Sequence, residues 1–208
     1  MRIGIIGSGR IGATVAKLLT RAGHDVAIAN SRGPDSLAGI AQDTGTHPAT
    51  VGDAAGFGEL VLVAIPLHAI GDLPADRFAG KVVIDANNYY PGRDGQIDRI
   101  DSGEITSSEL LAEHLDGARV VKAFNTMFFE TLASEGRPGA PREQRLALFF
   151  AGDHTEAKRR VADLIEEIGF AAIDTGPLGE GGRRQQSGAP LYNVTMTAPE
   201  AERALESA

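Results

Sequence analysis

The stretch Met1-Arg-Ile-Gly-Ile-Ile-Gly-Ser-Gly-Arg-Ile-Gly12 opens the chain with a short apolar run that leads into three spaced glycines. This is the pattern of a strand, a tight glycine turn and the start of a helix. The first glycine permits the turn, the second lets a pyrophosphate approach the backbone, and the third lets the helix pack on the strand. The start of such a helix also offers free N–H groups to phosphates. The stretch predicts a dinucleotide site, the alternative being a purely structural turn. The predicted site residues here are Gly7, Ser8, Gly9, Arg10, Ile11 and Gly12.

The second predicted strand, residues 25–30, ends without an acidic side chain. Units that bind NAD usually place Asp or Glu there, to accept a hydrogen bond from the ribose hydroxyl. Here Asn30 is followed by Ser31 and Arg32, and a hydroxyl beside a guanidinium suits a ribose 2′-phosphate. These three residues predict NADP(H) rather than NAD(H), with Arg10 as a second contact to the same phosphate. The alternative is that they only begin a helix.

Composition limits the class of protein. The 208 residues are 42% hydrophobic, enough for one sizeable core but not for two large domains. A formal net charge of −8 disfavours nucleic acid and anionic membranes as partners. The chain has no cysteine, which fits a reducing compartment, and no spacing typical of metal ligands. The longest apolar stretch, residues 60–67, is too short to span a bilayer. We expect a cytoplasmic protein that binds no metal, membrane or nucleic acid.

Strand and helix signals alternate along the chain, and the strands are continuous apolar runs. Such strands are buried on both faces, which is typical of a parallel sheet covered by helices. The predicted fold is α/β, a doubly wound, mostly parallel sheet forming a single Rossmann-like domain. Strands are expected near 2–6, 25–30, 46–48, 59–65, 81–86, 119–124, 146–151 and 171–174. Helices are expected near 10–22, 35–43, 67–72, 107–115, 127–135 and 155–168.

Residues 1–175 are predicted to form the NADP-binding domain, and 176–208 a loop and C-terminal extension that packs on it. Residues 176–190 are rich in glycine, and we expect a mobile loop near the site or a disordered connector. Because little chain remains for a substrate domain, the substrate is expected on the Rossmann domain itself. The apolar residues 191–194 are expected to contact a second subunit in a homodimer.

Ligands of open α/β sheets bind outside the carboxyl ends of the strands. We expect the backbone at Ile65 and Pro66 to pack against a ribose of the cofactor. Asn87 and Asn125 are expected to hydrogen-bond a carboxamide or an acceptor ring, although either suits a turn equally well. The predicted cofactor residues at the strand ends are Ala64, Ile65, Pro66, His68, Asn87, Ala123 and Asn125. No catalytic residue is assigned.

Several stretches together resemble one family. They are residues 7–12, Asn30-Ser-Arg32, Val63-Ala-Ile-Pro66, Val120-Val-Lys-Ala-Phe-Asn125, Ala151-Gly-Asp153 and Asp174-Thr-Gly-Pro-Leu178. The chain resembles the NADP reductases that depend on coenzyme F-420, a deazaflavin. The pattern is also similar to the NADPH-binding domain of the six-transmembrane ferric reductases.

This resemblance implies a hydride exchange between two coenzymes. NADP(H) would lie on the glycine turn, and a deazaflavin would stack on the nicotinamide, so that the protein mainly orients the rings and excludes water. Phe128 and Phe129 follow the predicted sixth strand and could stack on an isoalloxazine, so FMN or FAD is a second possible hydride partner. One alternative is an NADPH-binding regulatory or sensor module without turnover. Another is a reductase of a small carbonyl or imine. Lys122 is the only candidate proton donor for that reaction, although a packing or helix-end role suits it better.

Overall fold

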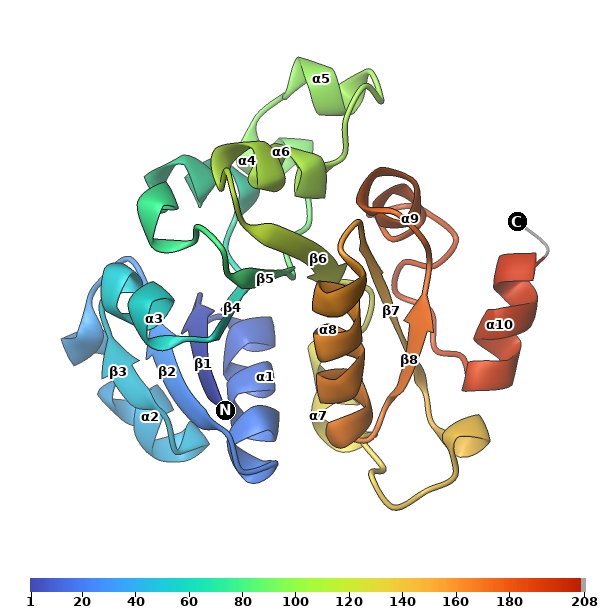
Figure 1. Ribbon diagram of the computed structural model, residues 1–208, viewed down its shortest axis with the longest axis horizontal. Coiled ribbons are helices and arrows are strands. Elements are labelled where there is room, and N and C mark those ends of the chain that lie inside the picture. Colours follow the sequence, from blue (N-terminus) through green and yellow to red (C-terminus); the bar gives the residue numbers. More distant parts are fainter. Residues whose placement is uncertain (207–208) are drawn as a thin grey trace.

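The computed structural model describes residues 1–206 and contains one eight-stranded sheet (Figure 1). The strand order is β3-β2-β1-β4-β5-β6-β7-β8, and all neighbours are parallel except β6 and β7. The doubly wound, mostly parallel α/β fold and all eight expected strands are therefore confirmed. The strands are β1 (Arg2–Ile6), β2 (Asp25–Ala29), β3 (His47–Ala49), β4 (Leu60–Val63), β5 (Val82–Asp85), β6 (Arg119–Ala123), β7 (Ala147–Gly152) and β8 (Ala171–Asp174).

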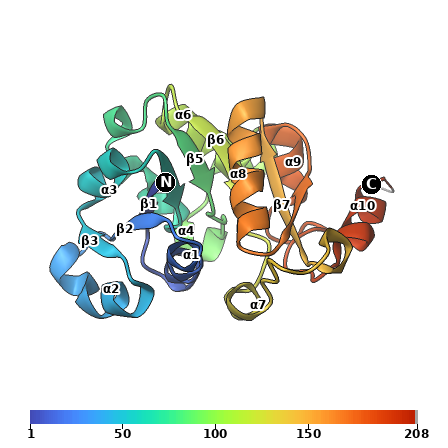
Figure 2. The ribbon, with the colours of Figure 1, turned by 60° about the horizontal axis from the view of Figure 1, so that its bottom comes forward.

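Helices cover both faces of this sheet, as Figure 2 shows for α1 and α2 on one side and α3 and α6 on the other. The alternation of side chains along each strand divides the core. In β4, Leu60 and Leu62 join the cluster of α1 and α8, while Val61 and Val63 join that of α3 and α6. The first face carries α1 (Arg10–Arg21), α2 (Ala38–Thr44), α7 (Phe129–Ser134) and α8 (Thr155–Glu167); the second carries α3 (Val51–Phe57), α6 (Ser107–His114) and α9 (Leu178–Arg184).

Several helices depart from the sequence expectations. Helix α3 was not expected, yet Thr50 caps it by accepting a hydrogen bond from the Asp53 N–H at 3.1 Å. The expected helix at 67–72 is a 3₁₀-helix, η2 (Leu67–Asp72). The remaining short elements are η1 (Pro34–Leu37), η3 (Ala75–Arg77), α4 (Pro91–Asp94), α5 (Asp98–Asp101) and η4 (Arg142–Gln144).

The expectation of a loop throughout 176–190 is wrong, because α9 occupies its first half. Leu178 is buried in the cluster of α6, and the buried Gly181 lets the helix lie close to the strand end. A Cβ on Gly181 would stand 2.7 Å from the Thr175 hydroxyl oxygen. Gly179 and Gly181 therefore serve close helix packing, whereas Gly176 and Gly188, outside the helix, have positive φ.

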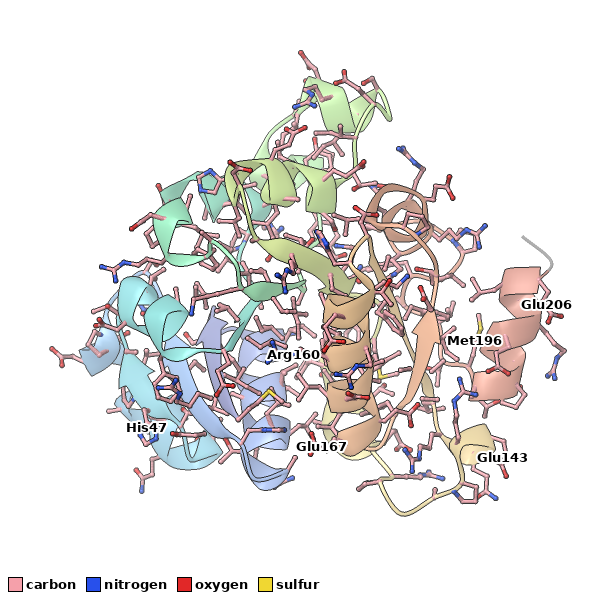
Figure 3. The ribbon with its side chains drawn as sticks, viewed as in Figure 1. His47, Glu143, Arg160, Glu167, Met196 and Glu206 are labelled. Carbon is pink, nitrogen blue, oxygen red and sulfur yellow. The ribbon has the colours of Figure 1, made fainter. Side chains whose placement is uncertain are left out.

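The C-terminal part of the chain packs on the far end of the sheet. Helix α10 (Ala198–Glu206) covers β7 and β8, and Met196 lies between α10 and β8 (Figure 3). Leu191 is buried in the same cluster, so part of the segment expected to meet a second subunit packs within its own chain. The homodimer stays a prediction. Glu167, at the end of α8 (Figure 3), forms a hydrogen bond with His24, which follows α1, at 2.9 Å.

Within residues 1–206, no helix has the length and apolar character that a membrane crossing requires. Over the same residues, no cluster of three His, Cys, Asp or Glu side chains is arranged to hold a metal ion.

Candidate functional site

The glycine turn lies between β1 and α1, and its three glycines have different reasons to be glycine. Gly7 has a φ of +112°, and a Cβ there would lie 2.1 Å from the Ala64 carbonyl oxygen. A Cβ on Gly12 would lie 1.9 Å from the Gly7 carbonyl oxygen. Both are demanded by the fold. Gly9 has an ordinary φ of −75°, and a Cβ there would meet nothing within 4 Å.

Gly9 therefore leaves open space that the protein itself does not use. It is the N-cap residue of α1, and no side chain caps this helix. The unpaired N–H groups of the first turn face outward with the positive end of the helix dipole. A twelve-residue helix start of this kind, bordered by empty space, fits the approach of a pyrophosphate.

Two cavities meet at Gly9. The first, here the Arg32 cavity, has a volume of about 260 Å³ and lies between the glycine turn, residues 30–32 and η2. The second, the Tyr90 cavity, has about 340 Å³ and lies between the glycine turn, residues 86–88, Tyr90 and Arg93. Gly9, Ala64, Ile65 and Pro66 line both. The two cavities thus form one elongated cleft at the carboxyl ends of β1, β2, β4 and β5.

In the Arg32 cavity, Asn30 organises the chain around itself. Its Nδ2 donates to the hydroxyl oxygens of Ser8 at 3.1 Å and Ser36 at 3.0 Å, and its Oδ1 accepts from the Arg32 N–H at 2.9 Å. Asn30 therefore ties the glycine turn to the loop after β2. Ser31 and Arg32 are exposed and line the cavity, and the Arg32 guanidinium makes no ion pair with any residue of 1–206.

In the Tyr90 cavity, Asn87 presents an unpaired donor. Its side chain is only 2% exposed, and its Oδ1 accepts from the Ile65 N–H at 2.8 Å. That bond fixes which way the amide points and leaves Nδ2 buried without a partner among the described residues. A buried unpaired amide N–H costs about 1–3 kcal/mol. A ligand carbonyl oxygen in the cavity would satisfy it.

Beneath Asn87 lies a buried ion pair. The Lys122 Nζ donates to the Asp85 Oδ2 at 3.2 Å and to the Asn87 carbonyl oxygen at 2.8 Å, and the Ser108 hydroxyl donates to the same Asp85 oxygen at 2.6 Å. Both charged side chains are fully buried. Lys122 holds the chain after β5 in place and lines neither cavity, so the structure gives it no position as an acid at the cleft.

The end of β6 stands one layer behind the cavity. Phe124 is buried with a φ of +67°, a strained conformation for a bulky residue. The next residue, Asn125, donates from Nδ2 to the Asn88 Oδ1 at 3.1 Å and to the Gln185 carbonyl oxygen at 2.7 Å. Neither Asn125 nor the fully buried Ala123 lines either cavity. Asn125 instead supports Asn88, which does.

The other predicted residues lie in different places, some in the Tyr90 cavity and one outside both cavities. Ile11 and Arg10 line the Tyr90 cavity, and the Arg10 guanidinium lies 4.9 Å from the centre of the Phe129 ring. Arg10 and Arg32 thus line different cavities. His68 lies outside both, with its Nδ1 3.1 Å from the Asp94 Oδ1. Burial raises the pKa of the Asp94 carboxyl, but hydrogen bonds from Arg93, the Tyr90 N–H and His68 outweigh it and hold that pKa well below its usual range.

Sequence reasoning missed Ala86, Asn88, Tyr90 and Arg93 in the lining of the Tyr90 cavity, and Tyr192 at its border. The Arg93 guanidinium stacks 4.9 Å from the centre of the Tyr90 ring, and the Tyr90 hydroxyl is hydrogen-bonded to that of Tyr192. Burial, together with the bond to Tyr90, raises the pKa of the Tyr192 phenol to about 12. The two tyrosines are 102 residues apart, and no local sequence pattern indicates their contact. The Tyr-Tyr-Pro run after a strand end was the available signal for Tyr90 alone.

The chain that forms this cleft is similar in sequence to known proteins. Residues 2–89 match the family model described as NADP oxidoreductase, coenzyme F420-dependent. Metalloreductase STEAP3 of Rattus norvegicus is 30% identical over 85% of the chain. The chain spans about one third of the length of the curated relatives it matches, 34% of this one.

Two solved structures are similar over most of their length. A hypothetical protein from Sinorhizobium meliloti is 34% identical with a TM-score of 0.82, covering 95% of each chain. A protein from Arthrobacter sp. FB24, titled as a candidate F420-dependent NADP reductase, is 26% identical with a TM-score of 0.71, covering 86% of each chain. On these matches, residues 2–89 carry the pattern of the coenzyme F420-dependent NADP oxidoreductases, and the chain as a whole is similar in fold to a protein named as one of them.

Proposed function

We propose that this protein transfers hydride between NADP(H), bound along the cleft, and coenzyme F-420 or a flavin such as FMN or FAD, bound in the Tyr90 cavity. The observation that carries the proposal is the open space at Gly9, where the fold demands no glycine and two cavities meet over an uncapped helix start. When bound, NADPH supplies the hydride from its nicotinamide ring.

The residues of the cleft fit this cofactor from end to end. The first turn of α1 binds the pyrophosphate, and Ser31 and Arg32 bind the 2′-phosphate. At the other end, Asn87 Nδ2 donates to the carboxamide oxygen of the nicotinamide, which gives this buried donor its partner. Ile65 and Pro66 form the apolar wall between the two ends. The protein thereby orients the ring and keeps its reacting face toward the Tyr90 cavity.

The names of the relatives support a redox reaction, and one of them names a planar acceptor. The Arthrobacter protein is named for F420 and NADP, and STEAP3 is named as a metalloreductase. Phe128 is 53% exposed, its ring centre is 5.6 Å from that of Phe129, and the Phe129 ring in turn holds Arg10 at the cavity. Neither ring lines the Tyr90 cavity, so the exposed Phe128 ring would meet only a part of an isoalloxazine or deazaflavin that extends past Arg10.

Anaerobic mixing of the protein and NADPH with coenzyme F-420 or FMN, followed by absorbance, tests the proposal. We expect NADPH to be oxidised as the acceptor is reduced, in a ratio of one to one. NADPH binding without reduction of either acceptor would contradict hydride transfer and favour a sensor module. No NADPH binding at all would contradict the assignment of the cleft.

A further inference from the structure

Tyr90 and Tyr192 join the cleft to the C-terminal part of the chain through their hydroxyl groups. We propose that Tyr90, held by Tyr192, donates a hydrogen bond to a ring carbonyl oxygen of the planar acceptor, so that residues 185–193 complete the acceptor site. This inference rests on the proposed function and adds the group that distinguishes acceptors with carbonyl oxygens from those without.

The hydrogen-bond count of the pair leaves one donor unused. Each phenol has one O–H donor and can also accept. The bond between the two hydroxyls uses one O–H, and neither hydroxyl has another partner within residues 1–206. Tyr90 lines the cavity and Tyr192 does not. When Tyr192 donates to Tyr90, the remaining O–H of the pair is that of Tyr90, at the cavity.

Tyr90 is held rigidly on its own side. Its N–H donates to the Asp94 Oδ2 at 2.9 Å, and the Asp94 side chain is fully buried. Arg93 covers the Tyr90 ring and also donates to the Asn88 carbonyl oxygen at 2.7 Å and to both Asp94 oxygens. A side chain fixed in this way loses little conformational entropy when it binds a ligand, so its hydrogen bond adds specificity.

Tyr192 is held just as firmly from the other side. The N–H of Asn193 donates to the carbonyl oxygen of Thr126, in the loop that joins β6 to α7, at 2.9 Å. Leu191 is buried under α10, and the Gln185 carbonyl oxygen accepts from Asn125. The segment 185–193 is therefore anchored at both ends beside the cavity. The Tyr192 phenol is protonated and able to donate at neutral pH, since its pKa, which burial raises to about 12, lies far above neutrality.

The chemistry of the acceptors matches a spare O–H. Flavins and deazaflavins carry two carbonyl oxygens on the ring that flanks the reacting centre, and a phenol O–H donates to such oxygens. A site that hydrogen-bonds its substrate discriminates strongly against analogues that lack the partner group, because its polar group is then left unpaired. A planar acceptor without carbonyl oxygens, such as a phenazine dye, gains nothing from Tyr90.

The test is acceptor binding to the protein saturated with NADP⁺, measured by the fluorescence of FMN and of coenzyme F-420. We expect Tyr90→Phe to raise the acceptor Kd about tenfold and Tyr192→Phe about threefold, since one removes the donor and the other its support. The Kd for NADPH and that for a phenazine dye should stay within about twofold of the wild type. A structural collapse would change all of these together.

Tyr89→Phe is the matched control. It removes the same hydroxyl from the neighbouring residue, whose bonds run to Asp101 at 2.9 Å and Gly95, away from the cavity. Its acceptor Kd should equal that of the wild type. Equal acceptor Kd values in Tyr90→Phe and wild type overturn the inference, as does a wild-type protein that binds NADP⁺ but neither acceptor.

Turnover of the same proteins separates this inference from the proposed function. If the wild type reduces FMN or coenzyme F-420 but Tyr90→Phe binds the acceptor normally, the inference alone fails. If Tyr90→Phe loses acceptor binding but the wild type transfers no hydride, the proposed function alone fails and the binding site stands.

Discussion

The two ends of the cleft are built in different ways. The Arg32 cavity takes its walls from the glycine turn, the end of β2 and the residues after β4, all within the first 73 residues. The Tyr90 cavity shares the glycine turn but depends on residues 86–93, on Asn125 behind Asn88, and on Tyr192 from near the C-terminus. The end proposed for the 2′-phosphate is thus local in sequence, and the end proposed for the nicotinamide and the acceptor is assembled from distant segments.

This difference explains why motifs identify one end and not the other. A glycine turn or a strand end is a short-range pattern, so a few residues are enough to predict it. A phenol pair across 102 residues depends on how β6, α9 and the C-terminal segment pack, which no local pattern encodes. The following experiments test whether a substitution at one end of the cleft leaves binding at the other end unchanged.

The largest effect is expected beneath the Tyr90 cavity. Lys122→Met leaves the buried Asp85 carboxylate without its ion-pair partner, so the free energy of unfolding should fall by about 3–5 kcal/mol. Denaturant titration measures this loss. Arg159→Met, which breaks two exposed pairs, with Glu156 and Asp163, is the control and should cost less than about 1 kcal/mol. Equal losses in the two variants would contradict the role given to Lys122.

At the junction of the two cavities, Gly9→Val should abolish cofactor binding without unfolding the protein. The side chain enters open space, so the fold is not crowded, but it fills the space assigned to the pyrophosphate. We expect the Kd for NADPH and NADH to rise about a hundredfold or more, about 3 kcal/mol. Fluorescence titration measures binding, and circular dichroism checks the fold.

Gly7→Ala is the comparison variant for Gly9→Val, because here the fold itself requires the glycine. Its φ of +112° and the contact of its Cβ with Ala64 mean that the substitution should lower stability, whatever it does to binding. A Gly9→Val protein that binds NADPH normally would show that the cleft is not the cofactor site.

At the Arg32 end alone, Arg32→Ala should change the choice between cofactors. Loss of a charge-assisted contact to the 2′-phosphate is worth about 1.5–3 kcal/mol, a ten- to hundredfold rise in the NADPH Kd. The NADH Kd should not change. Arg10→Ala, in the other cavity, should leave the ratio of the two Kd values as it is. An equal loss of NADPH and NADH binding in Arg32→Ala would sink the 2′-phosphate assignment.

The smallest effect is expected at the Asp94 support of the Tyr90 end. Hydrogen bonds lower the pKa of this carboxyl below its unfolded value, so its contribution to stability is present at neutral pH and lost as the pH falls. Asp94→Asn should cost about 1 kcal/mol at neutral pH. The gap to the wild type should narrow below about pH 4, where unfolded Asp protonates. A gap that stays constant from neutral to acid pH would show that the charge of Asp94 contributes nothing.

The sequence was sufficient for the fold because its strands are continuous apolar runs, and their burial on both faces leaves few alternatives. It also located the glycine turn and the Asn30–Arg32 segment. It failed on α3, a short helix that contains Gly52 and Gly56, and on α9, where Gly179 and Gly181 suggest a loop but instead allow close packing. It also could not place Ala123, Asn125 or His68, because a position after a strand end does not fix which way a side chain points.

The central claim is that one cofactor spans both cavities, and the structure of the protein with bound NADP⁺ tests it most directly. The account predicts the 2′-phosphate on Ser31 and Arg32, the pyrophosphate over Gly9, and the carboxamide oxygen on Asn87 Nδ2, with the ring facing Tyr90. A nicotinamide lying in the Arg32 cavity, or a cofactor bound away from Gly9, would contradict it.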